Sequence, residues 1–94
     1  MYFVYILHSL KLDKYYVGTT DDIEKRLTEH NSSIYIGSYT AKGVPWELVL
    51  KYSCLESDKA YKLERFIKRM KSSKFIKKVI ENSDILDDIC FNKL

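Results

Sequence analysis

The sequence predicts an α/β domain with a small three-stranded antiparallel sheet flanked by helices. Two observations predict it. Three short segments are rich in aromatic and β-branched residues, and helical segments follow the second and the third of them. The expected order is ββα, a loop, then βαα with a last short helix. A parallel doubly wound sheet would need repeated strand–helix–strand units, and only one such unit is present.

The first two strands are expected to form an antiparallel hairpin. Residues 2–8 (YFVYILH) and residues 15–19 (YYVGT) carry the strand-forming residues, and a short polar segment separates them. Thr20 is predicted to cap a first helix, because acidic residues crowd the next turn, and this helix should end near Asn31.

The second half of the chain is expected to give one strand and the remaining helices. Residues 32–45 contain two glycines and the single proline without periodicity, which predicts a loop. Residues 46–54 (WELVLKYSC) mostly alternate and predict the third strand. Ser57 is the expected N-cap of a helix that runs to about Met70, and Ser72 or Ser73 is expected to start a helix that runs to about Asn82. Residues 85–91 predict a last short helix. We expect one domain over residues 1–82, with residues 83–94 as a short helix or tail packed on it.

Composition excludes several classes of protein. Ninety-four residues with 46% hydrophobic residues fit one globular domain. No apolar run approaches 18 residues and the apolar start is too short for a signal peptide, so we expect a cytoplasmic protein without a membrane segment. Cys54 and Cys90 are 36 positions apart with no CxxC spacing, which predicts reduced thiols rather than a zinc site or a disulfide framework.

Positive charge is concentrated in one part of the chain. Residues 1–40 carry 4 basic and 5 acidic side chains, residues 41–80 carry 11 and 4, and residues 81–94 carry 1 and 4. Eight basic residues lie between Lys62 and Lys78. This distribution favours an anionic partner, above all nucleic acid, although a solvated helix face is the plain alternative.

Two charged residues border the apolar face of the first predicted helix. Ile23 and Leu27 share that face, and Arg26 and His30 are stacked one turn apart beside it. The alternatives are an Arg26 stem that covers apolar surface, and a His30 that lies at the edge of the core.

Glu64 is the acid nearest the apolar face of the second helix. It is the only acid within residues 59–78, so its carboxylate needs a basic partner or a metal ion. Mg²⁺ is commonly held by one carboxylate together with water and substrate phosphate. The apolar face itself is predicted to contain Ala60, Leu63, Ile67 and Met70.

Two tyrosines and one glycine stand out in the hairpin. Tyr5 and Tyr16 are expected to be cross-strand neighbours whose hydroxyls point to one patch, unless they serve only in packing. Gly18 lies inside a strand, where glycine marks a bulge or a close approach to the backbone.

In their order and spacing, these residues resemble the GIY-YIG nuclease domain, in particular the small stand-alone GIY-YIG proteins of bacteria. The resemblance runs from Tyr2 to Lys78. Phe3-Val4-Tyr5 stands where the family name has Gly-Ile-Tyr, and Tyr16-Val17-Gly18 stands for Tyr-Ile-Gly. The other matching segments are Arg26 to Asn31, Pro45-Trp46 and Leu63-Glu64-Arg65.

The resemblance implies metal-dependent hydrolysis of a nucleic-acid phosphodiester. Glu64 would hold a single Mg²⁺ or Mn²⁺, and Arg26 would contact the scissile phosphate. Tyr5 would lie near the attacking water, Tyr16 would share that role or position the phosphate, and His30 would accept or orient a tyrosine proton. Gly18 would allow a close approach to the backbone, and Thr40 or Lys42 would supply a polar or basic group. From the basic segment we expect phosphate contacts by Arg65, Lys68 and Arg69.

We therefore expect an endonuclease that hydrolyses DNA, with selectivity for DNA structure and a role in repair or recombination. One alternative is a nucleic-acid-binding module that has little or no catalysis of its own and acts with a partner. Another is a protein-interaction subunit, because the acidic residues 81–94 could form an amphipathic helix for a protein partner or a second copy.

Overall fold

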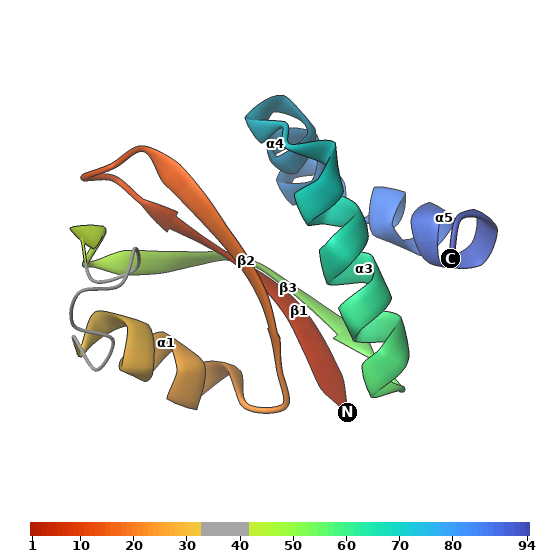
Figure 1. The fold of residues 1–94 in the computed structure, drawn as a ribbon, viewed down its shortest axis with the longest axis horizontal. Coiled ribbons are helices and arrows are strands. Elements are labelled where there is room, and N and C mark those ends of the chain that lie inside the picture. Colours follow the sequence, from red (N-terminus) through yellow and green to blue (C-terminus); the bar gives the residue numbers. More distant parts are fainter. Residues whose placement is uncertain (33–41) are drawn as a thin grey trace.

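A three-stranded antiparallel sheet forms the centre of the protein in the computed structural model, which describes residues 1–32 and 42–94. The strands are β1 (Tyr2–Ser9), β2 (Lys14–Thr20) and β3 (Trp46–Cys54). Their order in the sheet is β2-β1-β3, so β1 is central and β2 is an edge strand (Figure 1).

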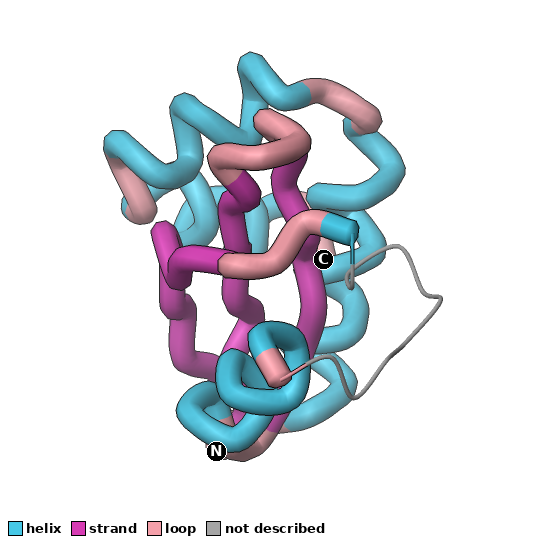
Figure 2. Tube along the Cα trace, turned by 90° about the vertical axis from the view of Figure 1, so that its left-hand side faces the viewer, coloured by secondary structure: helices cyan, strands magenta, loops and turns pink. Residues whose placement is uncertain are grey.

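Helices cover the two faces of this sheet. Helix α1 (Ile23–Asn31) lies on one face, whereas α3 (Ser57–Met70) crosses the other, and the chain continues from α3 into two short helices (Figures 1 and 2). These are α4 (Ser73–Glu81) and α5 (Asp84–Asn92). The predicted fold class is confirmed. The predicted loop at residues 32–45 falls largely on residues 33–41, which lie outside the described residues.

Successive side chains of β1 point to opposite faces of the sheet and belong to two separate apolar clusters. Val4 and Ile6 are fully buried on the side of α3, in the main core. Tyr5 and Leu7 are buried on the side of α1, together with Trp46. Because both faces of β1 are covered, a tyrosine in this strand is held between the sheet and α1.

Two of the predicted helix caps are wrong and one is confirmed. The N-cap of α1 is Asp22, whose side chain accepts from the backbone N–H of Lys25 at 3.1 Å, because Thr20 still belongs to β2. Ser57 is the first residue of α3 and follows the N-cap Glu56. Ser72 caps α4 as expected, and its hydroxyl accepts from the N–H of Phe75.

The C-terminal helices complete the core. Leu86 and Ile89 of α5 are buried, and the hydroxyl of Tyr52 donates to Asp87 at 2.6 Å. Met70 was predicted on the apolar face of α3 but is 47% exposed, because the helix ends there and the chain turns away through Lys71. Both cysteines are free.

Candidate active site

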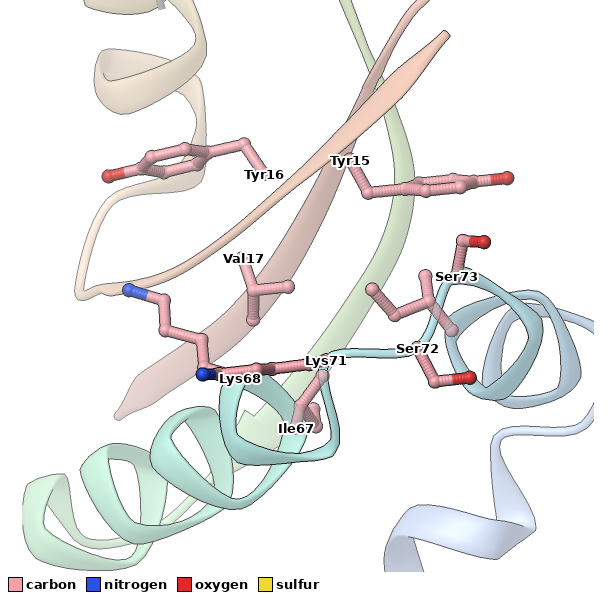
Figure 3. Close-up of a pocket in the computed structure, with 9 residues that line it drawn as sticks. Tyr15, Tyr16, Val17, Ile67, Lys68, Lys71, Ser72 and Ser73 are labelled. Atoms are coloured by element: carbon pink, nitrogen blue, oxygen red, sulfur yellow. The ribbon is translucent and has the colours of Figure 1, made fainter. Parts of the chain in front are cut away.

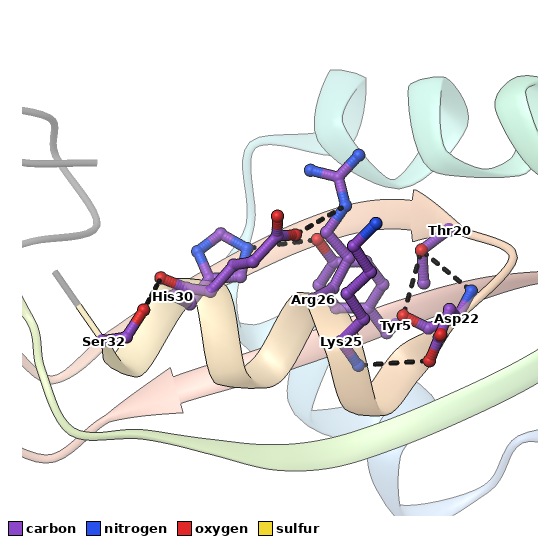
Figure 4. A network of polar contacts seen from close by, with 8 residues as sticks. Tyr5, Thr20, Asp22, Lys25, Arg26, His30 and Ser32 are labelled. Carbon is purple, nitrogen blue, oxygen red and sulfur yellow. Dashed lines mark hydrogen bonds and ion pairs between the residues drawn. The ribbon is translucent and has the colours of Figure 1, made fainter. Parts of the chain in front are cut away.

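The buried hydroxyl of Tyr5 contacts the ring of His30. Tyr5 comes from the central strand, and His30 comes from the last turn of α1 on the same face of the sheet. The hydroxyl oxygen lies 3.2 Å from Nε2 of His30, and only 3% of His30 is exposed (Figure 4). The two groups are therefore placed for proton exchange within a largely dry environment.

The Tyr16 ring lies beside this pair and is tilted to both rings. Its ring centroid lies 4.8 Å from that of His30 and 6.3 Å from that of Tyr5. The sheet register pairs Tyr5 with Gly18 and pairs Tyr16 with Leu7, so the two tyrosines are diagonal rather than direct cross-strand neighbours. Both tyrosines nevertheless meet at one histidine, because side chains two positions apart in a strand share a face.

Gly18 leaves room for the Tyr5 ring. A Cβ atom at Gly18 would lie 2.6 Å from the hydroxyl oxygen and 2.7 Å from Cζ of Tyr5. Any larger residue at this position would have to displace the tyrosine. The close approach to the Gly18 backbone is thus made by Tyr5, whereas a contact of Gly18 with nucleic acid stays a prediction.

Arg26 precedes His30 by one helical turn, and its side chain is 44% exposed. Its guanidinium forms an ion pair with Glu29 at 3.7 Å and projects from the same side of α1 as the His30 ring (Figure 4). Burial, and then the positive charge of Arg26, lower the pKa of His30, while Glu29 acts in the opposite direction. The imidazole is therefore neutral at pH 7 and can accept a proton.

Glu64 reaches the same region from α3. Its carboxylate is 20% exposed and pairs with the ammonium of Lys68 one turn later, at 2.9 Å. The Lys68 ammonium also lies 5.8 Å from the centre of the Tyr16 ring. Lys68 thus connects the carboxylate to the tyrosine–histidine cluster. Of the two partners predicted for Glu64, the structure contains the basic side chain.

The donor set around Glu64 limits how a divalent metal ion can be held. Within the described residues, no group of three or more His, Cys, Asp and Glu side chains gathers at one point. A cage built entirely from protein ligands is therefore missing from this part of the chain. One partly exposed carboxylate does fit the binding mode in which Mg²⁺ keeps several waters and takes further oxygens from a substrate phosphate.

The other predicted nucleic-acid contacts are not joined to this cluster. Arg65 and Arg69 are exposed on α3, and Lys42 is exposed next to residues 33–41. Among the described residues, no hydrogen bond or ion pair links these three side chains to Tyr5, His30 or Glu64. Thr40 lies outside the described residues.

Asn31 is a further residue of this site, and its sequence pattern alone did not point to a role. Its side-chain oxygen accepts from the N–H of Trp46 at 2.6 Å, and its Nδ2 donates to the carbonyl of the same residue at 3.0 Å. These bonds fix the end of α1 to the start of β3. Trp46 is 3% exposed and meets the Tyr16 ring edge-on at 6.3 Å. The position of Asn31, at the predicted end of the helix and next to His30, was the one sequence feature that could have indicated this role.

Comparison with known proteins shows the family of this chain. Residues 1–78 match the GIY-YIG catalytic domain family. The chain belongs to the GIY-YIG family. The match contains every element that builds the cluster, from β1 to α3, and it indicates a nuclease family.

A UPF0213 protein of Desulfotalea psychrophila is 38% identical over 69 residues, which are 73% of this chain and 62% of that protein. The chain thus matches about three fifths of the length of this relative. No solved structure matches. None of the described helices is long and apolar enough to cross a membrane.

Proposed function

We propose that this GIY-YIG protein is a divalent-metal-dependent endonuclease that hydrolyses DNA phosphodiester bonds, with Glu64 as the protein ligand of Mg²⁺ or Mn²⁺. The observation that carries the proposal is the Tyr5–His30 contact at 3.2 Å, with Arg26 beside it and Glu64 linked through Lys68. Selectivity for branched DNA, work in DNA repair or recombination, and a cytoplasmic location belong to the same proposal.

Tyr5 and His30 supply the proton transfer in this mechanism. The phenol donates its hydrogen bond to the neutral imidazole, which leaves lone pairs of the tyrosine oxygen to face the attacking water. As the water oxygen forms its bond to phosphorus, its proton passes to the Tyr5 oxygen and the phenol proton passes to Nε2 of His30. The bond from phosphorus to the leaving oxygen breaks, and this oxygen takes a proton from solvent. Tyrosine alone is a poor base at pH 7, so the neutral histidine gives it the needed acceptor.

Arg26 and Tyr16 act on the phosphate. Negative charge accumulates on the non-bridging oxygens during attack, and a guanidinium stabilises two of them together. The 44% exposure of Arg26 leaves its head group accessible to a substrate. The hydroxyl of Tyr16, whose ring lies next to both His30 and Tyr5, orients the phosphate or the water.

Glu64 is the residue that would hold the metal ion. When bound, a divalent ion supplies Lewis-acid stabilisation of the developing charge. To hold the ion, Glu64 would give up its ion pair with Lys68, and the Lys68 ammonium would then be available for a substrate phosphate. This exchange would make metal binding and DNA binding mutually supportive.

A nicking assay tests the proposal. Supercoiled plasmid and a panel of branched oligonucleotides are incubated at low salt with Mg²⁺ or Mn²⁺, and a parallel series contains EDTA. We expect metal-dependent nicking that EDTA abolishes, and faster cleavage of branched DNA than of linear duplex. Nicking that persists in EDTA would refute the metal dependence, and absence of nicking from all substrates would refute the endonuclease.

A nucleic-acid-binding module without catalysis is the second candidate. The Glu64–Lys68 ion pair favours it, because a carboxylate with a basic partner needs no metal ion. Tight, salt-sensitive binding without cleavage over long incubation would support this function.

A further inference from the structure

A pocket of about 300 Å³ opens at the free edge of β2, next to the candidate active site. Its apolar floor is formed by Val17, Ile67 and Ile76, of which the first two are buried in the core. Tyr15 and Tyr16 project from opposite sides of β2 at its mouth (Figure 3). The pocket thus combines an apolar floor with aromatic walls.

The rim of this pocket is cationic. Lys68 lies at the end of α3, and Lys71 occupies the turn between α3 and α4. Lys71 has a left-handed backbone (φ 48°), which ends α3 and places the next residue, Ser72, to cap α4. Both lysines are exposed, as is the neighbouring Ser73. An anionic group can therefore reach the ammonium groups while an apolar group packs on the floor beside the Tyr15 ring.

Two residues belong both to the pocket and to the candidate active site. Tyr16 lines the pocket and its ring lies 4.8 Å from that of His30. Lys68 lines the pocket and pairs with Glu64 at 2.9 Å. A ligand in the pocket would accordingly contact Tyr16 and Lys68, which themselves contact His30 and Glu64 of the candidate active site.

We propose that this pocket binds one unstacked nucleobase of the substrate strand, adjacent to the scissile phosphate. The base packs on the apolar floor and against the Tyr15 ring, and a flanking phosphate contacts Lys68 and Lys71. A flat ring next to a phosphate is the ligand chemistry that this combination of surfaces matches. A base inside a duplex is covered on both faces by its neighbours, so only an unpaired or flipped nucleotide can enter. The inference rests on the proposed function, since it places the pocket relative to a phosphate that is cleaved.

Variants that block the pocket with a ring, or remove a positive charge from its rim, test its role. Ser73→Phe adds a ring at the exposed mouth, and Ser83→Phe adds the same ring at an exposed position before α5, outside the pocket. Lys71→Asn removes the charge with a residue that tolerates the left-handed backbone. Lys93→Asn is the matched charge control near the end of the chain.

The readout is binding of a fluorescent single-stranded oligonucleotide, measured by anisotropy in EDTA. An abasic site is moved along the oligonucleotide one position at a time. We expect one position at which loss of the base weakens binding about tenfold or more. Ser73→Phe should bind the intact strand as weakly as the wild type binds that abasic strand, with no further loss. Lys71→Asn should weaken binding and reduce its dependence on salt, and the two controls should bind like the wild type.

Equal binding of every abasic strand by the wild type would overturn the proposal. So would a Ser73→Phe variant that still distinguishes the intact strand from the abasic one. The same oligonucleotides are also incubated with Mg²⁺, so that cleavage is scored separately. Base-dependent binding without cleavage would refute the nuclease function and leave the pocket, whereas cleavage without base dependence would refute the pocket alone.

Discussion

The hydroxyl oxygen of Tyr5 lies 3.2 Å from Nε2 of His30, although 25 positions separate the two residues. The contact exists because Tyr5 points from the central strand toward α1 and His30 closes the last turn of that helix. Both are almost fully buried, at 2% and 3% exposure. A change in the charge of His30 will therefore alter the ability of the Tyr5 hydroxyl to give up its proton.

Cleavage should fail at acidic pH when His30 becomes protonated. Burial and the Arg26 charge lower the pKa of His30 below its ordinary value of 6.5, so the folded protein takes up this proton at a lower pH than the unfolded chain. The free energy of unfolding should thus fall as pH drops through about 6.5 and level off below the folded pKa. NMR titration of the two histidines, with His8→Gln for assignment, measures the pKa directly. A His30 pKa at or above 6.5 would contradict this account.

Gly18→Ala should destabilise the fold by about 1–3 kcal/mol and reduce cleavage, because the added methyl group overlaps the Tyr5 ring. Urea denaturation measures the loss. The same substitution in a Tyr5→Ala background should cost much less, since the overlapping ring is gone. Equal costs in both backgrounds would mean that the glycine serves another purpose.

Arg26→Gln should lower the cleavage rate by about a hundredfold or more with little change in stability. The side chain is 44% exposed, so the fold does not depend strongly on it. Lys25→Gln is the matched control, because it removes a positive charge from the neighbouring exposed position. Single-turnover rates at saturating DNA separate the chemical step from binding. Equal losses in both variants would indicate a general charge effect.

The fold and the placement of Arg26 and His30 on α1 were readable from the sequence because they follow local rules, whereas the family resemblance grouped Glu64 and the two tyrosines with them. Alternation and aromatic content located the strands, and the spacing of Arg26 and His30 placed both on one side of α1. The register was less accessible. The pairing of Tyr5 with Gly18 depends on the turn between β1 and β2, where Asp13 adopts a left-handed backbone (φ 50°). Asp tolerates this conformation, but its presence alone does not fix the register of the hairpin.

Contacts between distant segments were the part that the sequence did not reveal. The bonds of Asn31 to Trp46 join residues 15 positions apart, and they depend on how α1 lies against β3. Lys68 is the only basic residue three or four positions from Glu64, so their ion pair follows the local spacing of the helix. The sequence did not reveal that the same ammonium also meets the Tyr16 ring, because that contact depends on the packing of α3 against β2.

Asn31→Ala should cost about 1–3 kcal/mol of stability, because it removes both side-chain bonds to the Trp46 backbone. Asn31→Asp keeps the oxygen that accepts from the Trp46 N–H and loses the group that donates to the Trp46 carbonyl. Its loss of stability should therefore be smaller than that of Asn31→Ala. Thermal or urea unfolding compares the two, with the exposed Asn92→Ala as control. Equal stability of Asn31→Ala and the wild type would show that the end of α1 is held by other contacts.

The most direct test of the central claim is the cleavage rate of Glu64→Gln in Mg²⁺, beside the wild type and the exposed control Glu81→Gln. The amide preserves the shape of the side chain but binds a divalent ion poorly. We predict that Glu64→Gln folds, still binds DNA in EDTA, and loses metal-dependent cleavage by about a hundredfold or more, while Glu81→Gln cleaves normally. Wild-type cleavage by Glu64→Gln would contradict the assignment of Glu64 as the metal ligand.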